Sequence, residues 1–168
     1  DYLRTIGRET QRLARLVGNV LDFSRLEQGR KKYVREELDL GAALGRLLDT
    51  HGPRLAEAGL ELRRVWPAEP VTVATDRDAV EQIVPNLLDN AGKYAAAGGE
   101  VVVALARRPA GGAAVRVLDR GPGVPAEHRG RIFEKFHRVD ETLTAEKTGA
   151  GLGLSIARQL ARGLGGNL

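Results

Sequence analysis

The sequence contains two apolar, valine-rich segments, EVVVALARR at residues 100–108 and AAVRVLD at residues 113–119, joined through a connector that contains proline and glycine. Such segments predict two β-strands, and the connector predicts a hairpin between them. The apolar face of a sheet must be covered by another layer. The second strand ends at Asp119, which is followed by RGPGVP. The hairpin therefore requires a covering layer and leaves a carboxylate where the chain turns away from the sheet.

Helices are predicted to supply this layer, because apolar residues recur at helical spacing in several other segments. Aspartates that precede two of these segments are predicted N-caps. Most helices come early and the hairpin comes later, which indicates a sheet with helices on one face. The predicted elements besides the hairpin are helices from Asp39 to about Leu55, from Asp78 to about Ala95 and from Gly151 to Arg162, a short helix over residues 127–133, and strands in GLELRRVW and VTVAT.

A long amphipathic helix is predicted over residues 3–26, ahead of the other elements. Its apolar side chains form a single stripe, and most of its arginines lie off that stripe. Such a stripe must be buried against something. Either the helix packs on the following domain, or it is half of a helical hairpin that dimerises, and the sequence leaves both open. The stripe consists of Leu3, Ile6, Leu13, Leu16, Val17, Val20 and Leu21.

The composition is that of a folded globular domain, and it argues against several classes of site and partner. The 168 residues are 42% hydrophobic and 29% charged. No apolar run reaches the roughly 18 residues that span a membrane, and the absence of cysteine excludes disulfides and thiolate metal sites. The net charge of +4 comes from scattered arginines, and aromatic residues make up only 4%. Such a surface argues against nucleic-acid binding.

Two amides and an ammonium share one face of the predicted helix over residues 78–95. Asn86 and Asn90 are four residues apart, and Lys93 follows on the same side. A carboxamide oxygen is a neutral ligand that suits Mg²⁺ already held by phosphates, and a lysine nearby attracts phosphate oxygens. A solvated helix face is the alternative interpretation of this stripe.

Asp119 is a candidate for reading a purine base. A carboxylate only accepts hydrogen bonds, so it can pair with the amine of adenine but not with the oxygen that guanine presents there. Gly121 and Gly123 leave room for a flat ligand near the backbone. The alternative is a tight turn that the aspartate caps through its own side chain.

A second glycine cluster, TGAGLGLSIA, opens the last predicted helix and carries Gly149, Gly151 and Gly153. Backbone N–H groups at such a helix start attract anions. The polar segment at residues 139–148 before it has the composition of a lid. Just upstream, IFEKFHR offers two phenylalanine anchors and the cations Lys135 and Arg138, although an amphipathic turn would use the same residues.

These motifs stand in the order Asn-x-x-x-Asn, D-x-G-x-G, F-x-x-F and G-x-G-x-G, and in this order they match the N, G1, F and G2 boxes of a known family. Residues 76–168 resemble the catalytic ATP-binding domain of sensor histidine kinases, which shares its fold with the type II topoisomerase, Hsp90 and MutL ATPases. Residues 1–30 resemble the second helix of the dimerisation and phosphoacceptor hairpin. The resemblance implies a two-layer α/β sandwich, with a mixed sheet packed under about three helices.

The resemblance also implies roles for individual residues. Asn90 is expected to coordinate Mg²⁺ with Asn86 in support, Tyr94 to stack near adenine, and Asp119 to bind the adenine amine directly or through water. Lys93 and Arg138 are expected to contact phosphate. The full implied set of ATP-binding residues is Asn86, Asn90, Lys93, Tyr94, Asp119, Gly121, Gly123, Val124, Lys135, Arg138, Gly149, Gly151, Leu152 and Gly153.

The implied function is transfer of the γ-phosphoryl group of ATP to a histidine, for relay to an aspartate of a response-regulator receiver domain. The implied organisation is a hairpin helix at residues 1–30, a linker at 31–38 and a catalytic domain at 39–168. The hairpin would make a homodimer in the cytoplasmic part of a bacterial sensor protein, with any membrane anchor upstream. This fragment is expected to make no membrane contact and to lack catalytic residues of its own, since none of its three histidines has the phosphoacceptor context.

Several features depart from the family pattern. Pro85 and Gly92 lie within the N-box helix, Thr148 replaces a common glycine, and the chain ends at GGNL, where the family continues into a final strand. With no methionine, the chain is expected to be a piece of a longer protein. A nucleotide-binding module without kinase activity, a serine kinase of the anti-sigma-factor type and a plain α/β interaction domain remain as alternatives.

Overall fold

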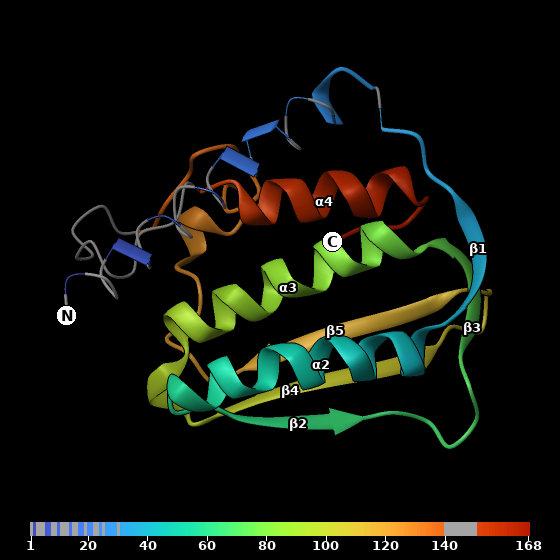
Figure 1. Cartoon of the computed structure of the whole chain (residues 1–168), viewed down its shortest axis with the longest axis horizontal. Coiled ribbons are helices and arrows are strands. Elements are labelled where there is room, and N and C mark those ends of the chain that lie inside the picture. Colours follow the sequence, from blue (N-terminus) through green and yellow to red (C-terminus); the bar gives the residue numbers. More distant parts are fainter. Residues whose placement is uncertain are drawn as a thin grey trace.

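The computed structural model describes residues 31–139 and 151–168, together with fourteen residues between 2 and 29: 2, 6, 7, 10, 14, 17, 18, 20, 21, 24 and 26–29. Its elements follow the order that the sequence predicts (Figure 1). They are β1 (Arg35–Asp39), α2 (Leu40–Glu57), β2 (Glu61–Val65), β3 (Thr72–Asp76), α3 (Arg77–Tyr94), the 3₁₀ turn η1 (Ala96–Gly98), β4 (Glu100–Arg107), β5 (Ala113–Asp119), the 3₁₀ turn η2 (Ala126–His128) and α4 (Gly153–Gly163).

The strands form one mixed sheet and one short antiparallel pair. In the mixed sheet, β4 lies between β2, which runs parallel to it, and β5, which runs antiparallel. β1 and β3 form the separate antiparallel pair. Figure 1 shows α2, α3 and α4 side by side over one face of the strands, with α2 and α3 nearer the sheet. The predicted α/β sandwich, with a mixed sheet under three helices, is confirmed.

The core lies between α2, α3 and the mixed sheet. Its most buried members, which are less than 2% exposed, include Leu44, Leu48, Leu88, Val101 and Val103. A second apolar cluster joins the outer face of α3 to α4 and to the segment before β1. Its buried members are Ala79, Leu152, Ile156 and Leu160, and the partly buried side chains packed against them are Leu26, Tyr33, Ile83 and Leu164.

Two helices begin at aspartates that cap them, as predicted. The Asp39 Oδ1 atom accepts the N–H of Ala42 at 3.1 Å at the start of α2. Asp76 is 4% exposed and accepts two backbone N–H groups, from Ala79 in α3 and from Val34 in the preceding segment, each at 2.7 Å. Asp76 therefore caps α3 and also holds the chain that enters β1.

The two caps predict different losses of stability. We expect Asp76→Ala to lower the free energy of unfolding by about 3 kcal/mol, because it strands two N–H groups, one at a buried helix start. Asp39→Ala, the matched control at the more exposed cap, should cost about 1 kcal/mol. Urea unfolding followed by circular dichroism measures both, and equal losses would contradict the double role of Asp76.

Two local features differ from expectation. Residues 35–38 lie in the expected linker, but together with Asp39 they form β1 and pair with β3, so their extended backbone finds hydrogen-bond partners. The helix expected over residues 127–133 is only the 3₁₀ turn η2 followed by turns. α2 continues through Pro53 to Glu57.

The departures within the N-box helix are accommodated. α3 runs from Arg77 to Tyr94 with Pro85 inside it. A Cβ added to Gly92 would lie 3.3 Å from the Leu55 side chain, so glycine allows α2 and α3 to approach closely there. The intrinsic cost of glycine in a helix is therefore offset by packing. Thr148 lies outside the described residues.

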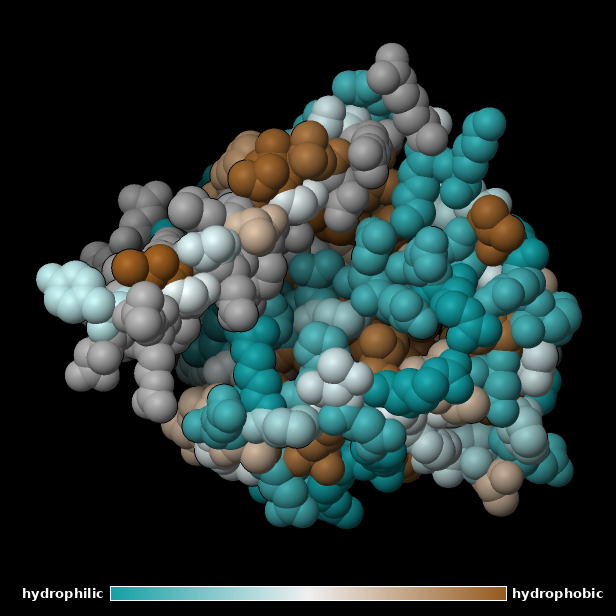
Figure 2. Space-filling view, viewed as in Figure 1, coloured by the Kyte–Doolittle hydropathy of each residue, from teal (hydrophilic) through white to brown (hydrophobic). Residues whose placement is uncertain are grey.

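All described residues from Tyr2 to Glu27 are helical. Those of the predicted stripe that are described, Ile6, Val17, Val20 and Leu21, are each at least half exposed. Figure 2 shows hydrophobic side chains gathered over this N-terminal segment at the upper left of the molecule. In the part of the chain that the structure describes, no helix is long and apolar enough to cross a membrane.

Candidate functional site

One stripe of α3 carries the polar residues that the sequence singled out. Asn86, Asn90 and Tyr94 follow one another at four-residue intervals, so they lie about 6 Å apart along one face of the helix. Lys93 follows Asn90 by three residues, so it lies on the same side of the helix as Asn90. Asn86, Asn90 and Lys93 are half-buried, whereas Tyr94 is 45% exposed. This stripe is the floor of the candidate site.

Asn86 contacts the start of α4. Its Nδ2 atom donates to the Gln82 carbonyl at 2.8 Å, which fixes the orientation of the amide. A Cβ added to Gly153, the first residue of α4, would lie 2.8 Å from Asn86 Oδ1. Gly153 thus brings the N box and the G2 box into direct contact, and a side chain at this position would displace the amide.

Asp119 contacts the other end of α3 through Gly121. The Asp119 Oδ1 atom accepts the N–H of Gly121 at 2.8 Å. A Cβ on Gly121 would lie 3.2 Å from both the Tyr94 carbonyl oxygen and the Ala95 Cβ. The turn after β5 is therefore packed on the C-terminal end of α3, beside Tyr94.

The Asp119 carboxylate also makes the local turn that was its alternative interpretation. Its hydrogen bond to Gly121 is of the Asx type, two residues along the chain. The side chain is nevertheless exposed, and a carboxylate has acceptor capacity beyond one hydrogen bond. The turn bond fixes the orientation of the group, which is what a base-reading carboxylate requires.

Gly151 lies against the F box. Its carbonyl accepts the Phe136 N–H at 3.1 Å, and a Cβ on it would come within 2.8 Å of the Phe136 backbone. Gly151 has φ of +68° and Phe136 has φ of +61°, which is unusual for a residue with a side chain. The F box and the G2 box are thus held together by backbone contacts. Residues 140–150, which include Gly149, lie outside the described residues.

The two F-box cations make different contacts. Lys135 forms an ion pair with Glu27 of the N-terminal segment. Arg138 lines a surface hollow of about 440 Å³ that contains His128 and His137, whose Nδ1 and Nε2 atoms are 3.0 Å apart. Among the described residues, the buried Nη2 atom of Arg138 has no hydrogen-bond partner.

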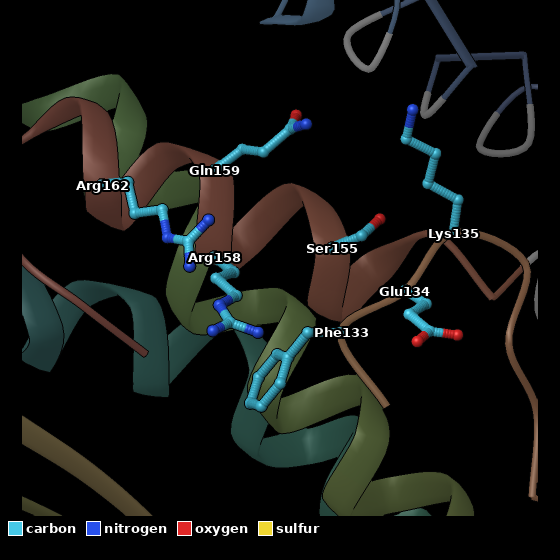
Figure 3. A pocket seen from close by; sticks show the side chains of 7 residues that line it. All are labelled: Phe133, Glu134, Lys135, Ser155, Arg158, Gln159 and Arg162. Atoms are coloured by element: carbon cyan, nitrogen blue, oxygen red, sulfur yellow. The ribbon is translucent and has the colours of Figure 1, made fainter. Parts of the chain in front are cut away.

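A second hollow of about 340 Å³ lies between the F box and α4 (Figure 3). The Arg158 guanidinium lies 4.7 Å from the centre of the Phe133 ring, and Lys135 points away from that pair. Neither hollow is lined by Asn90 or Asp119. The structure therefore brings the N, G1 and G2 residues together and places Lys135 and Arg138 on a neighbouring surface.

The other residues predicted for the site are Leu152, Gly123 and Val124. Leu152 is buried in the cluster between α3 and α4. Gly123 has φ of +74° with open space around it, and the Val124 carbonyl accepts Arg129 Nε at 3.0 Å. Among the described residues, no three His, Cys, Asp or Glu side chains are grouped as a metal ion would require.

Comparison with known families agrees with this geometry. A family model described as histidine kinase-, DNA gyrase B-, and HSP90-like ATPase matches residues 75–168. The chain belongs to this ATPase family. The matched range contains α3, the turn after Asp119 and α4, which are the elements that form the site.

Two curated relatives of the ATPase domain are sensor proteins. RssA of Serratia marcescens, a swarming motility regulation sensor protein, is 39% identical over 157 residues, covering 94% of this chain and 33% of that protein. The sensor histidine kinase WalK of Bacillus subtilis is 29% identical over 168 residues, covering 99% of this chain and 27% of WalK. The chain thus spans about a third or less of the length of these relatives.

Solved structures support the same placement. Full-length ShkA in complex with AMPPNP superposes with a TM-score of 0.84 at 30% identity, covering 98% of this chain and 34% of that one. The mycobacterial sensor histidine kinase MprB superposes with a TM-score of 0.66 at 32% identity, covering 79% of this chain and 81% of that one. The ATPase domain is therefore of the sensor histidine kinase type, which does not favour the non-enzymatic alternative.

Sequence reasoning missed the residues that support the Asp119 turn. Local patterns assigned Gly98 no role in the site, and they indicated Ala95 only as the approximate end of a helix. Glu100 binds Arg120 at 3.1 Å and Arg63 at 2.7 Å, and the hydrogen bond from Arg63 is the main cause that lowers the pKa of Glu100. No local pattern identifies these contacts, because each joins segments that are distant in the sequence.

Proposed function

We propose that this chain is the ATP-binding catalytic part of a sensor histidine kinase, which transfers the γ-phosphoryl group of ATP to a histidine outside this fragment. The observation that carries the proposal is the junction of three motifs on α3. Gly153 contacts Asn86 at one end of the polar stripe, and Gly121 contacts Tyr94 at the other. A single nucleotide can therefore lie along the stripe, with its base at Asp119 and its phosphates towards α4.

Each residue has a chemical reason for its proposed role. Asp119 accepts a hydrogen bond from the adenine amine, and Tyr94 stacks near the base. Asn90 binds Mg²⁺ through its amide oxygen, which suits an ion already shared with phosphates. Lys93 is a proposed phosphate contact from α3. The Nη2 atom of Arg138, which has no hydrogen-bond partner among the described residues, is a candidate phosphate contact from the F-box side.

The proposed site supplies positioning and charge neutralisation, which are what phosphoryl transfer chiefly requires. Mg²⁺, when bound, neutralises charge on the phosphates. Asn86 stands where ATP-hydrolysing members of the wider fold class use a glutamate to activate water, and an amide cannot take that proton. An imidazole acceptor needs no strong base from this domain, so the site favours transfer over hydrolysis.

In this proposal, residues 1–30 are the second helix of a dimerisation hairpin and 39–168 the catalytic domain. Residues 31–38 are the linker, whose last four residues belong to β1. The exposed side chains Ile6, Val17, Val20 and Leu21 support a helical partner and a homodimer. The partner downstream is a response-regulator receiver domain, and the proposed location is the cytoplasmic part of a bacterial sensor protein.

Titration of the purified fragment with ATP, ADP and GTP, each with and without Mg²⁺, tests the proposal. We expect binding of ATP and ADP, weak binding of GTP, and tighter ATP binding with Mg²⁺. Because the fragment lacks the phosphoacceptor context, no acid-labile phosphohistidine should accumulate on it with labelled ATP. Equal binding of ATP and GTP, or a stable phosphohistidine on this chain, would contradict the proposal.

A further inference from the structure

Gly98 is in backbone contact with the turn that carries Asp119. A Cβ added to Gly98 would lie 2.5 Å from the Arg120 carbonyl oxygen, 2.7 Å from its carbonyl carbon and 2.8 Å from its Cβ. Real Cβ atoms do not approach backbone this closely. The last residue of η1 therefore has to be glycine for the turn after β5 to occupy its observed position.

Neighbouring contacts also hold the turn after β5 in place. The Ala95 Cβ lies beneath Gly121, at 3.2 Å from the position of an added Cβ. Glu100 binds the Arg120 guanidinium at 3.1 Å, and Asp119 pairs with Val101 across the strands. The turn after β5 is thus held by close packing on Gly98 and Ala95 and by the ion pair between Glu100 and Arg120.

We infer that Gly98 is a positioning residue for adenine recognition, because its missing side chain sets the distance between the Asp119 carboxylate and the polar stripe of α3. This inference rests on the proposed function, since it requires adenine to bind at Asp119. Gly98 itself touches no part of the proposed nucleotide. It acts through Arg120, the residue next to Asp119.

The adjacent glycine provides a matched control. Gly99 has φ of +68°, and an added Cβ would meet nothing within 4 Å. Gly99→Ala therefore introduces backbone strain without pushing on the turn. Gly98 has no such positive φ, so Gly98→Ala introduces a steric clash with the turn and little conformational strain.

The experiment compares Gly98→Ala and Gly99→Ala in the same fragment, with ATP and GTP affinities measured by calorimetry and melting temperatures by circular dichroism. We expect Gly98→Ala to weaken ATP binding by about tenfold or more, as for the loss of one hydrogen bond to a charged group, and to lower the ratio of ATP to GTP affinity. Gly99→Ala should lower the melting temperature and leave the ratio unchanged. Equal ratios in the two variants would overturn the inference.

A second pair of variants decides the question if Gly98→Ala does not fold. Glu100→Gln removes the charge that holds Arg120, whereas Arg63→Gln removes the other partner of Glu100 and leaves Arg120 paired. The inference expects a lower ATP-to-GTP ratio only in Glu100→Gln, and an unchanged ratio overturns it. If the wild-type fragment shows no ATP preference at all, or if Asp119→Asn leaves that preference intact, the adenine assignment fails instead.

Discussion

Replacement of Asn90 by alanine is expected to weaken binding of Mg·ATP by roughly a hundredfold, because loss of an outer-shell partner alone costs 10–100-fold in metal affinity and Asn90 is the proposed direct ligand. Asn90 lies on the polar stripe of α3, one turn from Asn86 and one turn from Tyr94. Calorimetric titration with Mg·ATP measures the effect, and the fragment should keep its fold because the side chain is only half-buried.

Two controls separate a metal role from a structural one. In excess chelator, the wild-type fragment and Asn90→Ala should bind ATP with similar affinity, because the difference depends on the metal. Glu81→Ala, on an exposed position of the same helix, should bind Mg·ATP like the wild type. A loss for Asn90→Ala that persists without metal would refute its assignment as the Mg²⁺ ligand.

Asp119→Asn is expected to remove most of the preference for ATP over GTP, with ATP binding weakened by roughly a hundredfold. Sites built to hydrogen-bond a particular group discriminate strongly against its absence, since a mismatch strands a buried polar atom. An amide at this position offers one acceptor and one donor, so it no longer requires an amine on the base. The amide oxygen can still accept the Gly121 N–H, so the turn should persist.

Competition between ATP and GTP for the fragment, loaded with a fluorescent adenine nucleotide, measures this preference. Glu127→Gln, an exposed carboxylate in η2, is the matched control and should keep the preference of the wild type. If Asp119→Asn discriminates between the two purines as well as the wild type does, the base is read elsewhere.

The sequence contained enough information to predict the fold and the order of the motifs that form the site. The apolar, valine-rich segments at residues 100–108 and 113–119 predicted the hairpin, and Asp39 and Asp76 predicted where two helices begin. These features are local, because strand propensity and helix capping depend on residues within a few positions of one another. The assignment of individual nucleotide contacts stays a prediction, which the variants above test.

Only the tertiary structure decided which segments meet. Residues 35–39, an apparent linker, became β1 because β3 offered it a hydrogen-bonding partner. Lys135, whose role as an ATP-binding residue stays a prediction, forms an ion pair with Glu27, far away in the sequence. Contacts of this kind depend on how whole elements pack, and no local pattern encodes them.

Gly98 shows most clearly the difference between what the sequence determines and what tertiary packing determines. The sequence by itself determined that a glycine pair ends the helical unit and that a carboxylate stands at the end of a strand. The packing of η1 against the turn after β5 decided that the first glycine of this pair supports that carboxylate. The physical reason is that the missing side chain matters only where another backbone comes within van der Waals contact, and this approach exists only in the folded chain.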